Sequence, residues 1–164
     1  MLDIQRILKE LDDHVYTHAR VIEDCVGDVD DNVFPHSQIS LQGVEGNIDP
    51  AYGTGTLASC NNTEEEFVVP VFDIPYTNSI IKDLGMTRTR ILRMTERSCY
   101  SYHRDQTPRI HIPLITNDKC FMVIDDIVHR FPADGNYYIA DTTKLHTFVN
   151  GSWEDRIHIV GCIK

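Results

Sequence analysis

The second half of the chain alternates between short apolar runs and turn-forming residues. Eight such segments follow residue 85, at residues 88–94, 98–103, 109–116, 120–124, 127–131, 136–141, 147–150 and 156–163. Clusters of Asn, Asp, Pro and Gly separate most of them, as expected of turns between strands. This spacing predicts a mainly β fold, an antiparallel sandwich or barrel of which the jelly roll is one form.

The first half has a different pattern. Apolar residues recur at helical spacing in residues 3–19, with Asp3 placed to cap the start, which predicts an amphipathic helix packed outside the core. Residues 27–58 are rich in Gly, Asp, Asn and Pro, and we expect loops there that could also cover a substrate. Residues 67–72 are predicted to be a buried strand, and residues 78–84 a short helix that ends before a glycine.

Length and composition narrow the class of protein. The 164 residues, 41% hydrophobic and 24% charged, fit one domain over residues 1–164, with residues 1–85 supporting a core at residues 86–164. A formal net charge of −10 disfavours binding to nucleic acid or to an anionic membrane. No apolar run is long enough to span a bilayer, and the start lacks the features of a signal peptide. The five cysteines are scattered without a C-x-x-C pair. We therefore expect a cytoplasmic protein with reduced cysteines.

Residues 102–114 concentrate histidine, carboxylate and arginine side chains beside a short apolar run. In an extended segment His103 and Asp105 point to the same face, so they can converge on one ion. His146, which follows a predicted strand, is the candidate for a third ligand. Two histidines and one carboxylate form a facial triad that leaves neighbouring positions of an octahedral iron(II) open.

Arg156 lies ten residues after His146, at the start of the last predicted strand. Alternation places His158 on the same face as Arg156. A buried guanidinium needs an anion, and a dicarboxylate matches its planar fork. Each of these residues taken alone is commonly structural, but the ordered set favours a metal site with an anion anchor.

The ordered set resembles a known family, the iron(II)- and 2-oxoglutarate-dependent oxygenases of the aspartyl/asparaginyl β-hydroxylase type, which also contains proline-hydroxylase-like enzymes. The resemblance spans residues 88–163 and is carried by these motifs: His103-Arg104-Asp105, residues 109–117, residues 135–141, His146-x-x-x-Asn150 and Arg156-Ile157-His158. It implies a double-stranded β-helix, the cupin-like jelly roll, with the N-terminal helices packed outside.

The resemblance also implies roles for individual residues. His103, Asp105 and His146 would bind iron(II) and act in catalysis through it. Arg156 would hold the distal carboxylate of 2-oxoglutarate, and Arg109 and His111 would lie near this co-substrate.

The implied activity is that of a dioxygenase that couples decarboxylation of 2-oxoglutarate to hydroxylation of an unactivated C–H bond. The cofactor would be iron(II), with 2-oxoglutarate and dioxygen as co-substrates. The substrate would be a small-molecule amino acid, or an Asp, Asn or Pro residue in a peptide or protein. Halogenating relatives carry a small residue in place of the carboxylate ligand, so Asp105 favours hydroxylation.

Two alternatives stay open. The chain could be a cupin-like module that binds or senses a small molecule, although such a module has no need of a complete triad. It could instead be a jelly-roll hydrolase or isomerase that uses zinc or manganese at the same ligands. Arg156 weighs against that alternative, because simple hydrolysis needs no dicarboxylate anchor.

Overall fold

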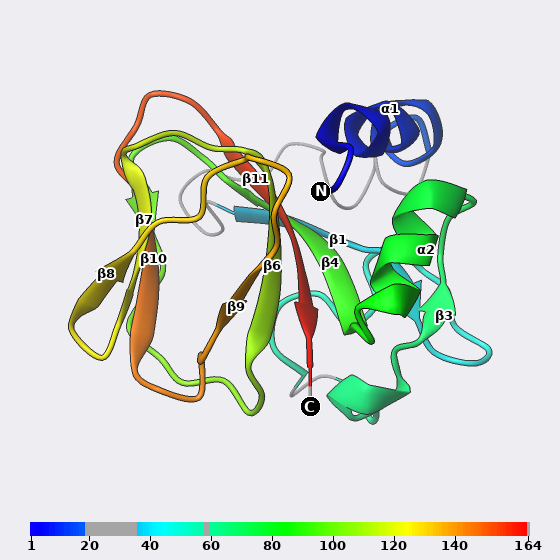
Figure 1. The fold of residues 1–164 in the computed structure, drawn as a ribbon. Coiled ribbons are helices and arrows are strands. Elements are labelled where there is room, and N and C mark those ends of the chain that lie inside the picture. Colours follow the sequence, from blue (N-terminus) through cyan, green and yellow to red (C-terminus); the bar gives the residue numbers. More distant parts are fainter. Residues whose placement is uncertain (19–35, 58–59, 164) are drawn as a thin grey trace.

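The structure is a computed structural model that describes residues 1–18, 36–57 and 60–163 (Figure 1). Its elements in chain order are α1 (Ile4–His14), β1 (His36–Ser40), β2 (Gln42–Gly43), the 3-10 helix η3 (Glu64–Glu66), β3 (Val69–Pro70), α2 (Pro75–Asp83), β4 (Thr87–Met94), β5 (Ser98–Cys99), β6 (Arg109–Ile115), β7 (Cys120–Ile124), β8 (Ile127–His129), β9 (Tyr138–Ala140), β10 (His146–Asn150) and β11 (Arg156–Cys162).

Two antiparallel sheets face each other. One sheet has the strand order β1-β4-β11-β6-β9 and the other has the order β5-β10-β7-β8, while β2 and β3 form a separate pair. From β4 onward the chain passes back and forth between the two larger sheets, with β4, β6, β9 and β11 in one and β5, β7, β8 and β10 in the other. This is the topology of a jelly roll, so the predicted fold class is confirmed.

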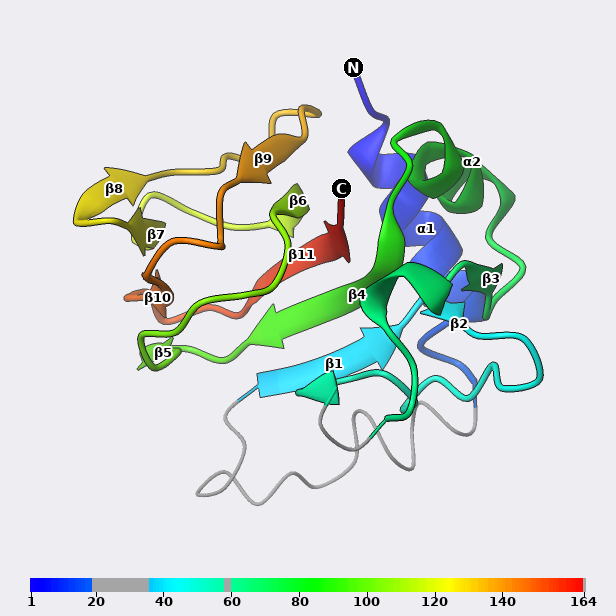
Figure 2. The same ribbon diagram turned by 90° about the horizontal axis from the view of Figure 1, so that it is seen from below.

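The five-stranded sheet carries apolar side chains on the face that meets the helices. Figures 1 and 2 show α1 and α2 on one side of this sheet, opposite β7, β8 and β10. Ile159 of β11 lies in register with Ile91 of β4 and Ile112 of β6, and the three pack with Ile7 and Leu11 of α1. Each buried side chain of this size stabilises the fold by about 1.5–3 kcal/mol. The helices therefore support the sheet from behind.

The opposite face of the same sheet is divided between apolar and polar side chains. Met94 of β4 meets Met122 of β7 and Phe148 of β10 in a second apolar cluster between the sheets. Alternation along β4, β6 and β11 places a set of buried polar side chains beside this cluster: Arg88, Arg90, Arg109, His111, Arg156 and His158.

Helix α1 begins as predicted and ends earlier. The Asp3 carboxylate accepts a hydrogen bond from the Arg6 N–H at 3.0 Å and caps the helix. The helix ends at His14 instead of continuing to residue 19, which lies outside the described residues. After His14 the backbone turns, with two N–H groups donating to the carbonyl of Leu11. In the described part of the chain, no helix combines the length and apolar character needed to cross a membrane.

Helix α2 begins at Pro75, before the predicted start at residue 78. Proline is favoured in a first turn because it has no N–H to leave unpaired. The next two N–H groups, of Tyr76 and Thr77, donate to the Glu10 carboxylate at 2.9 and 2.8 Å, so α1 caps α2. Gly85 follows the helix at φ 62°, as predicted for its end.

Three strand predictions need correction. Residues 27–58 were predicted to be loops, but strand β1 forms within them. It forms because the free edge of β4 pairs with it. Residues 27–35 and 58 of that range lie outside the described residues. In residues 67–72 only Val69–Pro70 pairs, with β2, since this segment lies beyond the large sheets. In residues 98–103 regular pairing stops at Cys99, where the chain leaves the sheet.

Glu64 of η3 ties the segment before β3 to the five-stranded sheet. Its carboxylate pairs with Arg88 Nη1 at 3.0 Å and with Arg109 Nη2 at 2.7 Å, and it accepts a hydrogen bond from Thr107 Oγ1 at 2.7 Å. Burial raises the pKa of Glu64, but the Thr107 hydrogen bond and the two arginine charges outweigh burial and lower the pKa to about 2. The carboxylate is therefore charged and compensates two buried cations.

Replacing Glu64 should destabilise the fold strongly. Glu64→Gln keeps the side-chain shape but leaves Arg88 and Arg109 without a counter-charge, so we expect the free energy of unfolding to fall by about 3–5 kcal/mol. Urea unfolding at neutral pH measures this loss. The exposed Glu45 provides a control, since Glu45→Gln should change stability by less than about 0.5 kcal/mol.

The loss of stability in Glu64→Gln should also depend on pH. Because folding lowers the pKa of Glu64 from 4.5 to about 2, the unfolded chain binds more protons between these values. The stabilisation by Glu64 is complete above pH 4.5 and disappears as the pH falls towards 2. The difference in stability between wild type and Glu64→Gln should shrink over that interval, and a constant difference would contradict this account.

Candidate metal centre

His103, Asp105 and His146 come from two segments that the backbone holds together. The N–H of His103 donates to the carbonyl of His146 at 3.0 Å, and the reverse hydrogen bond is 2.9 Å. The N–H of Asp105 donates to the carbonyl of Thr142 at 2.8 Å. Residues 103 and 105 thus converge through an isolated β-bridge and a loop contact. His103 and Asp105 were predicted to share one face of an extended segment. They do converge, but outside a regular strand, because the pairing of β5 ends at Cys99.

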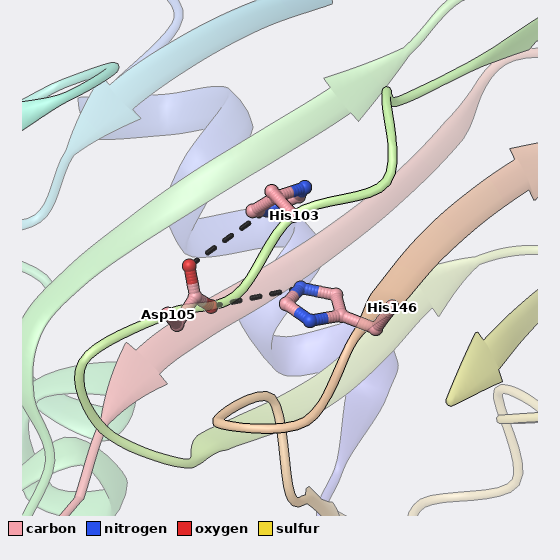
Figure 3. Close-up of side chains that lie close together, drawn as sticks. All are labelled: His103, Asp105 and His146. Atoms are coloured by element: carbon pink, nitrogen blue, oxygen red, sulfur yellow. Dashed lines mark ion pairs between the residues drawn. The ribbon is translucent and has the colours of Figure 1, made fainter. Parts of the chain in front are cut away.

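The three side chains point toward one another (Figure 3). One ligand atom from each of them lies within 4.8 Å of the other two. Asp105 Oδ1 is 3.7 Å from His103 Nε2, and Asp105 Oδ2 is 3.8 Å from His146 Nε2. Two imidazole nitrogens and a carboxylate at this separation can share one divalent ion and leave its remaining positions open.

Backbone carbonyls fix which nitrogen of each histidine faces the centre. His103 Nδ1 lies 2.7 Å from the Ser101 carbonyl, and His146 Nδ1 lies 2.9 Å from the Lys144 carbonyl. Because a carbonyl oxygen can only accept, each Nδ1 carries a proton and each Nε2 presents its lone pair to the centre. Burial lowers the pKa of His146, which favours the neutral, ligating form.

The three side chains differ in their exposure to solvent. His146 at the start of β10 is 4% exposed, Asp105 is 21% exposed and His103 is 43% exposed. The centre is therefore closed on the side of the sheet and open beside His103.

Arg109, predicted to lie near a co-substrate, lines the cavity wall beside Asp105. Its Nε lies 3.1 Å from Asp105 Oδ2, and its Nη2 pairs with Glu64 at 2.7 Å. Its Nη1 donates to Glu64 at 3.1 Å and to the Thr107 carbonyl at 2.9 Å. All three of its nitrogens have protein partners, so this arginine connects the Glu64 carboxylate to the candidate ligand Asp105.

A cavity of about 530 Å³ lies over the three candidate ligands. Arg156 of β11 forms part of its wall and is 1% exposed. The guanidinium stacks 3.8 Å above the Phe148 ring, its Nη2 lies 2.7 Å from His158 Nδ1, and its Nε has no hydrogen-bond partner. No carboxylate of the described residues pairs with it. This side chain is a buried cation in the wall of the cavity, and its predicted role as an anion anchor stays a prediction.

His111, which lines the cavity, and His158, which contacts Arg156, are both buried. Burial, followed by the charge of Arg156, lowers the pKa of both imidazoles well below the usual value, so both are neutral at physiological pH. An arginine can only donate, so His158 Nδ1 accepts its hydrogen bond. A neutral acceptor does not compensate a positive charge, and Arg156 therefore retains an unbalanced charge. His111 lies in the cavity wall, and its role near a co-substrate stays a prediction.

The residues of the site that were not identified as such from the sequence include Glu64, Arg88, Arg90 and Thr142. The two arginines alternate along β4, and such alternation of charge in a strand flanked by apolar residues was an available signal of a polar cavity. Glu64 stands among three consecutive glutamates, a pattern typical of an exposed turn. Thr142 acts mainly through its carbonyl, which no side-chain pattern reveals.

The fold is similar to several solved structures over about half of the chain. A cupin domain from Bordetella pertussis is 15% identical, with 47% of this chain and 80% of that one covered at a TM-score of 0.41. A protein from Photorhabdus luminescens is 15% identical over 44% and 57% of the two chains, at a TM-score of 0.37. The polyketide cyclase RemF from Streptomyces resistomycificus is 12% identical over 47% and 54%, also at 0.37. The chain spans less than two thirds of the last two proteins.

No curated protein matches the chain. A family model, described as aspartyl/asparaginyl beta-hydroxylase, matches residues 59–163, which are more than half of the chain. The match includes the three candidate ligands, Arg156 and the Glu64 segment that the sequence resemblance did not reach. The chain therefore belongs to the aspartyl/asparaginyl beta-hydroxylase family.

Proposed function

We propose that this protein is a non-haem iron(II) dioxygenase that uses 2-oxoglutarate to hydroxylate a C–H bond of an amino acid, or of an Asp, Asn or Pro residue in a peptide. The observation that carries the proposal is the placement of two histidine Nε2 atoms and a carboxylate beside a buried arginine that has no carboxylate partner. Membership of a hydroxylase family supports it.

The donor set suits iron(II). Imidazole nitrogens and one carboxylate are the ligands of facial-triad iron sites, and the Nδ1 hydrogen bonds to backbone carbonyls already orient both imidazoles. When bound, iron(II) with 2-oxoglutarate and dioxygen supplies the oxidant for hydroxylation, with succinate and carbon dioxide as co-products. The protein provides the ligands, their orientation and the cavity above them.

Each neighbouring residue has a separate task in this proposal. Arg109 holds the Asp105 carboxylate in place through Nε and is itself fixed by Glu64. Arg156 offers Nε and its remaining donors to the distal carboxylate of 2-oxoglutarate, with Phe148 supporting its plane. His111 and His158, both neutral, add no charge that would compete with that carboxylate.

Loss of one ligand should abolish the spectroscopic signature of the centre. Under nitrogen, wild-type protein loaded with iron(II) and 2-oxoglutarate should show a weak charge-transfer band in the visible range, and His146→Ala should lack it. The matched control is His129→Ala, which changes a histidine of β8 outside the centre and should keep the band. A wild-type protein that binds iron but gives no band would contradict the oxygenase proposal and favour a hydrolase or a binding module.

Removing the anion anchor should weaken co-substrate binding and leave iron binding intact. Arg156→Ala deletes a charged hydrogen-bond donor, which costs about 2–5 kcal/mol, so the Kd for 2-oxoglutarate should rise by roughly 30-fold to several thousand-fold. Calorimetric titration under nitrogen measures this Kd, and metal analysis measures iron content. Arg93→Ala, on the other face of β4 and paired with Asp155, serves as the control. An unchanged Kd in Arg156→Ala would place the anchor at another residue.

A further inference from the structure

The cavity contains more positive charge than the proposed reaction uses. The buried arginines in its wall are Arg88, Arg90, Arg109 and Arg156. Glu64 and Asp105 are the carboxylates among its described lining residues. Four buried guanidinium groups against two carboxylates leave a formal excess of two positive charges, and the fifth arginine of the lining, Arg104, is exposed to solvent. The whole chain has a net charge of −10.

The four arginines fall into two groups. Arg88 donates from Nε to the Gly53 carbonyl at 3.0 Å, from Nη1 to Glu64 at 3.0 Å and from Nη2 to the Gly55 carbonyl at 2.6 Å. All three nitrogens of Arg88 are thus bonded, as are those of Arg109. Every side-chain nitrogen of both arginines thus has a protein partner, as is usual for buried structural arginines.

Arg90 lacks such partners although it is only 6% exposed. Its Nη1 donates to Gln38 Oε1 at 3.1 Å, and its Nε has no hydrogen-bond partner. No carboxylate of residues 1–18, 36–57 or 60–163 pairs with it. Burial, with the charges of Arg88 and Arg109, lowers the pKa of Arg90 to about 10, so the side chain remains charged at neutral pH without compensation. Such a buried cation is costly unless a ligand neutralises it.

The neighbouring contacts orient Arg90 toward the cavity. On β4, Arg88, Arg90 and Leu92 line the cavity, while Ile91 packs with the helices on the other face. Gln38 of the adjacent strand β1 also lines the cavity, and its Oε1 accepts a second hydrogen bond, from the Gly55 N–H at 3.0 Å. The amide therefore holds the guanidinium in place through a neutral contact and leaves its charge available.

We infer that Arg90, oriented by Gln38, binds a carboxylate group of the substrate while Arg156 holds the co-substrate. This inference rests on the proposed function. There, the two positive charges of iron(II) cancel the two negative charges of 2-oxoglutarate, so the excess of two positive charges in the cavity wall remains. The substrate is then an anion: a free amino acid through its α-carboxylate, or an Asp residue through its side chain. Asn and Pro residues within a peptide carry no such group and are excluded.

Thermal unfolding with sodium acetate as the probe tests this site without turnover. The full chain is loaded with iron(II), saturated with 2-oxoglutarate under nitrogen and heated in acetate or in chloride at equal ionic strength. Acetate should raise the Tm of wild type by roughly 3 °C more than chloride does, because it binds the folded state. The same Tm in both salts would overturn the inference.

Three variants locate the effect. Arg90→Met should lose the acetate shift and have a Tm in chloride at least equal to that of wild type, because an uncompensated buried cation is removed. Gln38→Glu places a carboxylate beside Arg90, which would pair with the guanidinium in place of acetate, so this variant should also lose the shift. It therefore tests the inference if Arg90→Met does not fold. Arg93→Met, which alters the opposite face of β4, should keep the shift. Retention of the shift in Arg90→Met or in Gln38→Glu would overturn the inference.

Omitting 2-oxoglutarate separates the two possible sources of the carboxylate. A shift that is present without 2-oxoglutarate and abolished by saturation with it would assign Arg90 to the co-substrate and overturn the assignment to the substrate. Persistence of the shift at saturation supports the substrate site. If the charge-transfer band were absent while the Arg90-dependent shift remained, the proposed function would fail and the anion site would stand.

Discussion

The cavity depends on a balance between buried arginines and the few carboxylates that compensate them. Glu64 lies between Arg88 and Arg109 and neutralises charges on two strands that are not adjacent in the sheet. Through Arg109 its influence extends to Asp105, and through Thr107 it fixes the start of β6. Buried charges are tolerated when they are paired and hydrogen-bonded, so this carboxylate stabilises Arg88 and Arg109, whereas Arg90 and Arg156 have no carboxylate partner among the described residues.

Because side chains alternate along its strands, the five-stranded sheet has one face that packs against the helices and another that lines the cavity. Ile91 and Ile159 face the helices, while Arg90 and Arg156 on the same two strands face the cavity. A shift of register by one residue would exchange these faces and place arginine against α1. Burying that charge would cost free energy, which fixes the register of the strand pairing. The helices can therefore hold the sheet firmly without a side chain of their own in the site.

Much of the β architecture could be predicted from the sequence, because β4, β6, β7, β10 and β11 combine apolar runs with marked turns. The convergence of His103 and Asp105 was predicted from strand alternation, and His146 was added from its place in the ordered set; in the structure a β-bridge and a loop bring the three together. The order and spacing of these residue types therefore predicted the site better than the strand geometry that was assumed for them.

The parts that could not be predicted depend on distant partners. Glu64 meets Arg88 and Arg109 across 24 and 45 residues of sequence, and no local pattern distinguishes it from its exposed neighbours. Strand β1 exists because β4 offers a free edge, which is a property of the assembled sheet. Arg90 cannot be recognised from the sequence, because its lack of a carboxylate partner depends on which residues surround it in the folded protein.

The unequal exposure of the three candidate ligands bears on how long a metal ion would stay. His146 is enclosed by the sheet, whereas nearly half of the His103 side chain meets solvent. Chelators and competing cations would reach the centre past the exposed His103 imidazole. Exchange with the surrounding pool would be faster than at a fully enclosed site, and the metal found in a purified sample would reflect the metals available during its preparation.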